Sequence, residues 1–217
     1  MNDHWENMAR QGSRFFGKMT ASLSHEIKNA LAIINEKAGL LEDFTLMAEQ
    51  GRGMDPKRLK SLAGDIMKQI QRADGLVKRL NRFAHSADEW VRTVELEEAL
   101  ALILSIAHRP ASMREAVLEA EPASTPLQVT TKPFLLENMI WACIEFFLSE
   151  NQKRIRLIPE KTSDGVRIRF VGDLPLPESS GLLFPGEAEK VLLRALGAEL
   201  RMKPATGEMV LHLPKGP

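Results

Sequence analysis

Two long stretches of apolar residues at helical spacing constrain this chain most. In the first, over about residues 12–49, an apolar side chain recurs every third or fourth position. These positions are Phe16, Met19, Leu23, Ile27, Ala30, Ile34, Ala38 and Leu41. At roughly 100° per residue they fall within about 50° of one line along a helix. The pattern therefore predicts one long helix with a narrow apolar seam, of the kind that packs in coiled coils.

The second stretch, over about residues 56–87, repeats the same spacing. Its apolar positions are Leu59, Leu62, Ile66, Ile70, Ala73, Val77, Leu80 and Ala84. Between the stretches, Gly51 and Gly53 give turn freedom, and Asp55-Pro56 is typical of a helix start. Two long helices with a short connection predict an antiparallel hairpin. Because a lone hairpin leaves each seam half covered, we expect a homodimer that forms a four-helix bundle.

After about Asp88 the pattern changes to shorter segments. The expected helices cover about 96–106, 134–149 and 188–200, and the expected strands cover 117–120, 127–130, 155–158, 166–170, 199–202 and 209–213. Asp164-Gly165 predicts a hairpin turn, and Pro110, Pro122 and Pro126 indicate loops. The fold class is therefore α+β, a helical hairpin followed by a small α/β sandwich. We expect domains at 1–90 and 91–217.

Composition excludes several functional classes. Lys+Arg and Asp+Glu both number 29, so the basic excess of a general nucleic-acid or membrane-surface binder is missing. No apolar run reaches the roughly 18 residues that a spanning helix needs. The single cysteine, Cys143, lies in an apolar run and indicates a buried thiol in a reducing, cytoplasmic setting. The histidines at 4, 85, 108 and 212 share no ligand spacing, so no metal site is expected.

His25 stands out on the first helix. Relative to the whole seam it lies at roughly 180°, pointing away from the bundle core. Asn29 is one turn further along the same face, and Ser22 is a small neighbour. Glu26 could polarise the imidazole or accept its proton, and Lys28 could lie near phosphate oxygens. An isolated histidine on a polar helix face usually has no function. Whether His25 has one must therefore be judged from the residues around it.

These residues form the string Ser-His-Glu-Ile-Lys-Asn-Ala-Leu over 24–31. It resembles the phosphoacceptor motif of sensor histidine kinases, Ser-His-Glu-(Ile/Leu)-(Lys/Arg)-(Asn/Thr)-Pro-Leu, at seven of eight positions. The resemblance extends through residues 72–77, 80–84 and 94–98. It implies that His25 accepts phosphate, that Glu26 assists, and that Asn29 orients water when a partner regulator is dephosphorylated. Ala30 replaces the usual proline, which predicts a straighter helix.

The second domain resembles the ATP-binding domain of the same family, without its chemistry. Trp141 and Glu145 stand where the family has two asparagines, and Asp173 lacks the glycines that should follow it. Residues 179–186 replace the glycine-rich lid. We expect this domain to keep the fold and to bind no cofactor, as in dimeric histidine phosphotransferases built from a degenerate kinase core.

The leading hypothesis is phosphoryl transfer between His25 and a receiver aspartate of a response regulator. The phosphate would come from that regulator or from an upstream histidine kinase. One alternative is an active sensor histidine kinase or regulator phosphatase that uses ATP and magnesium, which labelled ATP distinguishes. Another is a non-catalytic scaffold that pairs with a kinase bundle. That alternative requires a His25→Ala protein to keep full biological activity.

Overall fold

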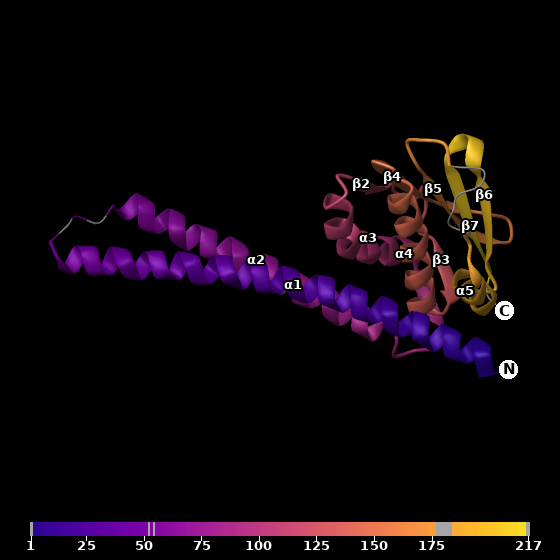
Figure 1. The fold of residues 1–217 in the computed structure, drawn as a ribbon, viewed down its shortest axis with the longest axis horizontal. Helices are drawn as coiled ribbons and strands as arrows, with labels where there is room; N and C mark the ends of the chain where they lie inside the picture. The colour runs from indigo at the N-terminus through magenta and orange to yellow at the C-terminus, as the bar shows by residue number, and fades with distance from the viewer. Residues whose placement is uncertain (1, 52, 54, 177–183, 216–217) are drawn as a thin grey trace. The chain divides into compact units, whose positions relative to one another are not determined.

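The computed structural model describes residues 2–51, 53, 55–176 and 184–215 (Figure 1). By their internal contacts, residues 18–82 form a helical unit, and residues 1–17 together with 83–217 form an α/β unit. Helix α1 (Asn2–Glu49) and helix α2 (Pro56–His85) each contribute to both units. The first turns of α1 therefore belong with the α/β unit, whereas the sequence predicted that all of residues 1–90 form one domain.

The predicted helical hairpin is confirmed by α1 and α2 (Figure 1). Helix α1 is unbroken through Ala30 but begins at Asn2, well before the expected start near Gly12. Contacts before Gly12 accompany the early start, because Met8 and Ala9 line one hollow of the α/β unit together with Trp90 and Phe134. Just after it, Phe15 is 4% exposed, and its ring lies 5.3 Å from Phe83 and 5.4 Å from Phe134. Tertiary contacts of this kind extend helices beyond what their local sequence favours.

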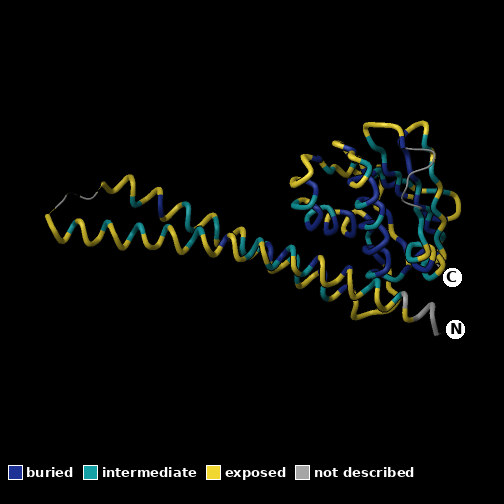
Figure 2. Tube along the Cα trace, in the orientation of Figure 1, coloured by how far each residue is buried: buried dark blue, intermediate teal, exposed yellow. Residues whose placement is uncertain are grey.

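The apolar face of the hairpin is wider than the contact between its two helices. Met19, Leu23 and Ala30 on α1 are fully buried, and Leu62 and Leu76 on α2 are 7% and 1% exposed. Large apolar side chains at one edge of the same face are open to solvent. These are Leu31 on α1 and Met67, Ile70 and Val77 on α2, each between 42% and 54% exposed. Figure 2 shows buried and exposed residues alternating along both helices.

The α/β unit has a five-stranded sheet of order β2-β4-β5-β7-β6 and a two-stranded sheet of β1 and β3. Strand β2 is parallel to β4, and every other pair is antiparallel. The elements are β1 (Arg92–Glu95), α3 (Leu96–Ser112), β2 (Val117–Ala120), β3 (Gln128–Thr131), α4 (Pro133–Ser149), β4 (Arg154–Lys161), β5 (Gly165–Val171), α5 (Glu187–Leu196), β6 (Glu199–Lys203), a 3₁₀ turn (Pro204–Thr206) and β7 (Glu208–Pro214). The predicted hairpin turn at Asp164-Gly165 joins β4 and β5.

Several predicted boundaries need correction. Pro110 lies inside α3 instead of a loop, because the final turn of that helix buries Ala107 and Ala111. Helix α5 ends at Leu196, because Gly197 adopts the left-handed conformation (φ 64°) that terminates helices. Strand β1 was not predicted, and it pairs with β3.

One face of the large sheet carries paired charges. Arg169 binds Glu160 at 3.1 Å and also binds Glu208, whose side chain is 9% exposed. Partial burial of each carboxylate raises its pKa, but hydrogen bonds from Arg167 and Arg169 to Glu160, and from Arg169 and Lys203 to Glu208, outweigh this. Both pKa values therefore lie below their usual 4.5. The stability that the network contributes is therefore present above about pH 4.5 and is lost as the pH falls through the lowered pKa values.

We predict that Arg169→Gln lowers the free energy of unfolding by about 2 kcal/mol at pH 7, because it removes the cation that two partly buried carboxylates share and leaves Glu160 with Arg167 alone and Glu208 with Lys203 alone. The loss should shrink on acidification below about pH 4.5, since protonated carboxyls need no cation. Urea unfolding of both proteins at pH 7 and near pH 3.5 measures this. Arg201→Gln is the control, because the pair Arg201–Glu199 is exposed. A loss of the same size at both pH values would contradict the prediction.

Candidate functional site

His25 lies in the middle of α1, in the helical unit, and is exposed. The buried residues Met19, Leu23 and Ala30 define the line along which α1 packs on α2. At roughly 100° per residue, His25 lies about 140° from that line. The expected angle of about 180° referred to the whole seam, of which α2 covers only one edge.

Helical geometry separates the two sides of the hairpin. On α1, Leu31 marks the open apolar edge. Viewed down the helix axis, Leu31 and His25 lie on opposite sides of the packing line. On α2, Met67, Ile70 and Val77 lie in one direction from that helix's buried line, and Arg72 lies in the other. In an antiparallel pair the same rotational direction leads to the same side of both helices. The hairpin thus has one open apolar side and one polar side, and His25 is on the polar side.

The other predicted residues of the site differ in their positions. Asn29 is exposed and Ser22 is half-buried, and both lie on the polar side between His25 and the packing line. Lys28 is exposed and points further from α2. The structure therefore groups Ser22, His25 and Asn29 on one surface, with Lys28 at its outer margin.

Glu26 is directed differently from His25. It lies close to the packing line, its side chain is 14% exposed, and its Oε2 is 3.6 Å from Nη2 of Arg72 on α2. The assistance that Glu26 gives to the imidazole stays a prediction, whereas its ion pair with Arg72 is a feature of the structure. Arg72 lies in the stretch 72–77 that carries the resemblance, but the sequence assigned it no role, because the register between two antiparallel helices sets its pairing with Glu26.

The expected remnants of a nucleotide site lie in the α/β unit. Trp141 on α4 is 4% exposed, and Glu145 one turn later is half-buried. One residue that the sequence analysis passed over is Asn138, which is 3% exposed and whose Nδ2 has no hydrogen-bond partner among the described residues. An asparagine inside a strongly apolar helix was the signal that could have identified it.

Hydrogen bonds within the protein hold the turn after β5 in place. The Asp173 carboxylate accepts a hydrogen bond from the backbone N–H of Lys153 at 3.0 Å. The Gln152 side chain, which is 2% exposed, accepts from the backbone N–H of Leu174 at 2.8 Å and donates to its carbonyl at 3.0 Å. A Cβ atom at Gly172 would lie 2.3 Å from Gln152 Oε1, so glycine is required here for close packing.

The segment expected to replace the lid, residues 179–186, is only partly within the described residues, since 179–183 lie outside them. The Phe184 ring stacks on Phe146 of α4 with 4.6 Å between the centroids. Leu176, before the segment, is 3% exposed. Both ends of this connection thus place apolar side chains against the domain.

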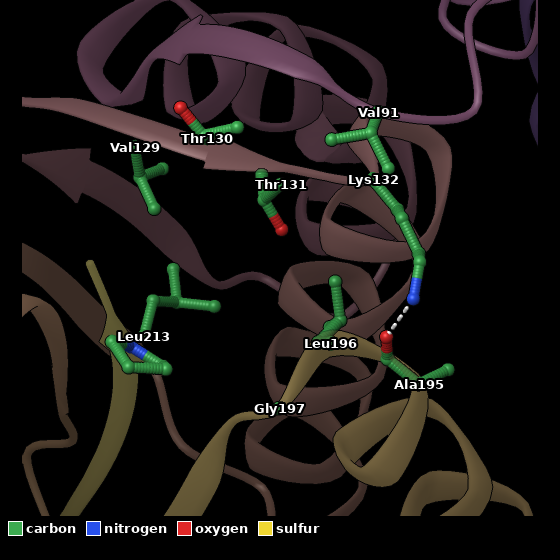
Figure 3. A pocket seen from close by; sticks show the side chains of 10 residues that line it. Val91, Val129, Thr130, Thr131, Lys132, Ala195, Leu196, Gly197 and Leu213 are labelled. Atoms are coloured by element: carbon green, nitrogen blue, oxygen red, sulfur yellow. Dashed lines mark hydrogen bonds between the residues drawn. The ribbon is translucent and has the colours of Figure 1, made fainter. Parts of the chain in front are cut away.

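A separate small cavity, of about 210 Å³, lies between the end of β3, the end of α5 and the end of β7 (Figure 3). The Lys132 ammonium donates a hydrogen bond to the Ala195 carbonyl beside it and lies 5.4 Å from the ring centroid of Trp90. Trp141, Glu145 and Asp173 do not line this cavity. It is therefore distinct from the place where the resemblance puts a nucleotide.

The described residues contain no group of three His, Cys, Asp or Glu side chains that could hold a metal ion. None of the helices in this part of the chain is long and apolar enough to cross a membrane.

Comparison with known proteins gives similarity in structure alone. No family model matches the sequence, and no curated protein matches it. Histidine kinase AdeS of Acinetobacter baumannii is 14% identical, with a TM-score of 0.49 over 89% of this chain and 98% of that one. Histidine kinase ThkA, in its complex with response regulator protein TrrA, is 16% identical, with a TM-score of 0.49 over 98% of this chain and 66% of that one. The ATP-binding domain of PrrB from Mycobacterium tuberculosis is 15% identical, with a TM-score of 0.46 over 59% of this chain and 99% of that one.

These similar structures are histidine kinases or their catalytic domains. The observed architecture, a helical hairpin followed by an α/β domain, confirms the predicted elements of the fold. At such low identities the similarity says nothing about chemistry, so the function has to be argued from this chain's own residues.

Proposed function

We propose that this protein acts in two-component signalling as a phosphotransfer protein. His25 accepts a phosphoryl group from an aspartate on a response-regulator receiver domain, or returns one to it. The observation that carries the proposal is the exposure of His25 on the polar side of the hairpin, within a string of phosphoacceptor type. A receiver can approach this side without displacing any part of the hairpin core.

The reaction exchanges one bond to phosphorus for another. The imidazole nitrogen that carries no proton attacks the phosphorus atom, and the N–P bond forms as the bond between phosphorus and the aspartyl oxygen breaks. The aspartate leaves as a carboxylate, and the other ring nitrogen of His25 releases its proton to solvent. The reverse sequence returns the phosphoryl group to the receiver. Both phosphorylated forms are high-energy species, so exchange needs no ATP.

The α/β unit does not fit ATP with magnesium, the group that the resemblance implies. Trp141 brings bulk instead of an amide oxygen, and a hard cation prefers oxygen ligands. The Asp173 carboxylate already accepts the backbone N–H of Lys153, and the following turn is tied to Gln152. These features support a domain that keeps its fold and uses no cofactor, so the phosphate comes from a receiver or an upstream histidine kinase.

The open apolar edge of the hairpin supports a homodimer. Met67, Ile70 and Val77 follow a spacing of three and seven residues, and Leu31 lies on the same side of α1. These large side chains are about half exposed in a single chain, so full burial would stabilise each by roughly 1 kcal/mol. A second copy related by a two-fold axis would cover them and close a four-helix bundle. A cytoplasmic location, where receivers are found, fits the single buried thiol of Cys143.

The proposed function predicts opposite outcomes with two phosphate donors. A receiver domain labelled on its aspartate should transfer label to this protein within minutes, whereas labelled ATP with magnesium should leave it unlabelled. The labelled bond should break in acid and persist in alkali, as expected for N–P and not for an acyl phosphate. Autophosphorylation from ATP would favour an active kinase instead. Absence of transfer from a panel of receivers would exclude the proposal.

A further inference from the structure

We propose that Arg72 provides the positive charge that receives the phosphoryl group at His25, and that Glu26 is a positioning residue that holds Arg72 in place. This inference rests on the proposed function and assigns roles within the same site. It replaces the expectation that Glu26 acts directly on the imidazole. The observation behind it is an ion pair across the hairpin, beside the exposed histidine.

Glu26 is placed to serve α2 and not the imidazole. Successive residues on a helix point about 100° apart, so Glu26 and His25 project in different directions although they are neighbours in sequence. The Glu26 side chain is 14% exposed and its Oε2 faces Arg72 Nη2 at 3.6 Å. A carboxylate that takes a proton from a ring nitrogen has to reach that nitrogen directly or through one water. This carboxylate is held in the groove between the helices instead.

Arg72 is placed to reach a phosphoryl group on His25. Because Glu26 directly follows His25, the ion pair puts the Arg72 guanidinium at the height of His25 along the hairpin. Its side chain is 50% exposed and lies on the polar side. A guanidinium has five N–H donors in a planar fork that matches phosphate oxygens. The contact with Glu26 joins Nη2 alone to one carboxylate oxygen at 3.6 Å, so the other N–H groups of the fork can bind a second anion while this ion pair is kept.

The surroundings of Arg72 strengthen this assignment. Gly75 and Arg79 lie three and seven residues further along α2, on the same side of the helix. A Cβ atom at Gly75 would lie 3.8 Å from Arg79 Nη1. Among the described residues, the half-buried Arg79 has no hydrogen-bond partner at its buried Nε. Residues 18–82 hold twelve Lys or Arg and eight Asp or Glu, although the whole chain is neutral. With Arg72 and Arg79 on the polar side of a hairpin of net positive charge, this side favours a partner that presents an anionic group.

Stabilisation of the fold alone is a weak explanation for the ion pair between Glu26 and Arg72. A half-exposed ion pair contributes little to stability, typically below about 1 kcal/mol. During transfer, by contrast, negative charge is spread over the three equatorial oxygens of the phosphoryl group. A cation that is already held next to the acceptor stabilises that charge without a costly rearrangement. No magnesium or nucleotide is needed at His25 itself for this stabilisation.

Kinetics of transfer from a phosphorylated receiver to the full chain tests the assignment, with rate and KM measured from pH 6 to 9. Arg72→Gln should lower the transfer rate about 100-fold, the size seen when one preorganised donor is removed from a charged transition state, and Arg72→Lys should restore part of it. Glu26→Gln should lower the rate only about 5- to 10-fold, since Arg72 remains but is less well held. The shape of the pH profile should not change. The double variant should be no slower than Arg72→Gln, because both act through one guanidinium.

The control is Lys78→Gln, which removes a cation of α2 that is paired with Asp74 at 2.8 Å and is 76% exposed. It should transfer at the wild-type rate. The inference is overturned if Arg72→Gln transfers as fast as the control. It is also overturned if Glu26→Gln is the slower single variant and loses an ionisation from the pH profile, because Glu26 would then be the base. A wild-type protein that receives no phosphate ends the proposed function and this inference together, whereas a labelled wild type with a fast Arg72→Gln variant ends the inference alone.

Discussion

His25→Gln is expected to abolish labelling by a phosphorylated receiver, with transfer reduced by at least about 10³-fold. A glutamine amide has no nucleophilic lone pair comparable to that of an imidazole nitrogen, so no N–P bond can form. Because His25 is exposed, the substitution should leave the hairpin intact, and circular dichroism and thermal unfolding should match those of the wild type. The measurement is phosphate incorporation over time from a labelled receiver, together with the Kd of that receiver.

His85→Gln is the matched control. His85 is also exposed and helical, and its Nδ1 lies 2.6 Å from Asp88 Oδ2 near the end of α2. Labelling of this variant should equal that of the wild type. An His25→Gln protein that still binds the receiver but takes up no phosphate would isolate the chemistry from docking. Continued labelling of His25→Gln would show that another group is the acceptor and would refute the assignment.

The periodicity of the sequence was enough to predict the helical hairpin, because apolar spacing reports directly which side of a helix is buried. It could not show which part of the seam is buried within one chain. Leu23 and Val77 both belong to the seam, yet Leu23 is fully buried and Val77 is 42% exposed. That difference depends on how far one helix covers the other, which is a property of their packing and not of either sequence segment.

Element boundaries failed where tertiary packing outweighed local preference. Pro110 disfavours a helix interior, but the burial of neighbouring Ala107 and Ala111 keeps the last turn of α3 helical around it. The polar residues before Gly12 carry no seam pattern, and the burial of Phe15 against Phe83 is a long-range contact that no window of sequence contains. Gly197, in contrast, ended its helix for a local reason that the sequence does contain.

For the candidate site, too, the sequence predicted which residues are exposed but not which residues they pair with. The exposure of His25 follows from helical geometry alone, and the structure agrees. The pairing of Glu26 with Arg72 depends on the register between two helices 46 positions apart in the chain. The closure of the turn at Asp173 depends on Gln152, a residue with no motif of its own that the fold brings beside Leu174. Motifs located the residues of interest, and the three-dimensional contacts changed what those residues are free to do.

The double substitution Ile70→Asp and Val77→Asp is expected to convert a dimer into a monomer. These side chains are 45% and 42% exposed in the single chain, so a carboxylate at either position stays hydrated when the protein is alone. In a four-helix bundle the same carboxylates would be buried without partners, at a cost of several kcal/mol each. The two-fold axis doubles every substitution, so four charges would enter the interface. The dimer dissociation constant should rise by at least about 10³-fold.

Analytical ultracentrifugation at micromolar concentrations measures this change. Met47→Asp is the control, because Met47 is 43% exposed on α1 but lies on the polar side of the hairpin, in the opposite rotational direction from the apolar edge. It adds the same charge to an equally exposed apolar position and should leave the dimer intact. The doubly substituted protein should keep the helix content of its hairpin, because Leu23, Leu62 and Leu76 remain packed within the chain. A wild-type protein that is monomeric at these concentrations would contradict the dimer, and so would a doubly substituted protein that still dimerises.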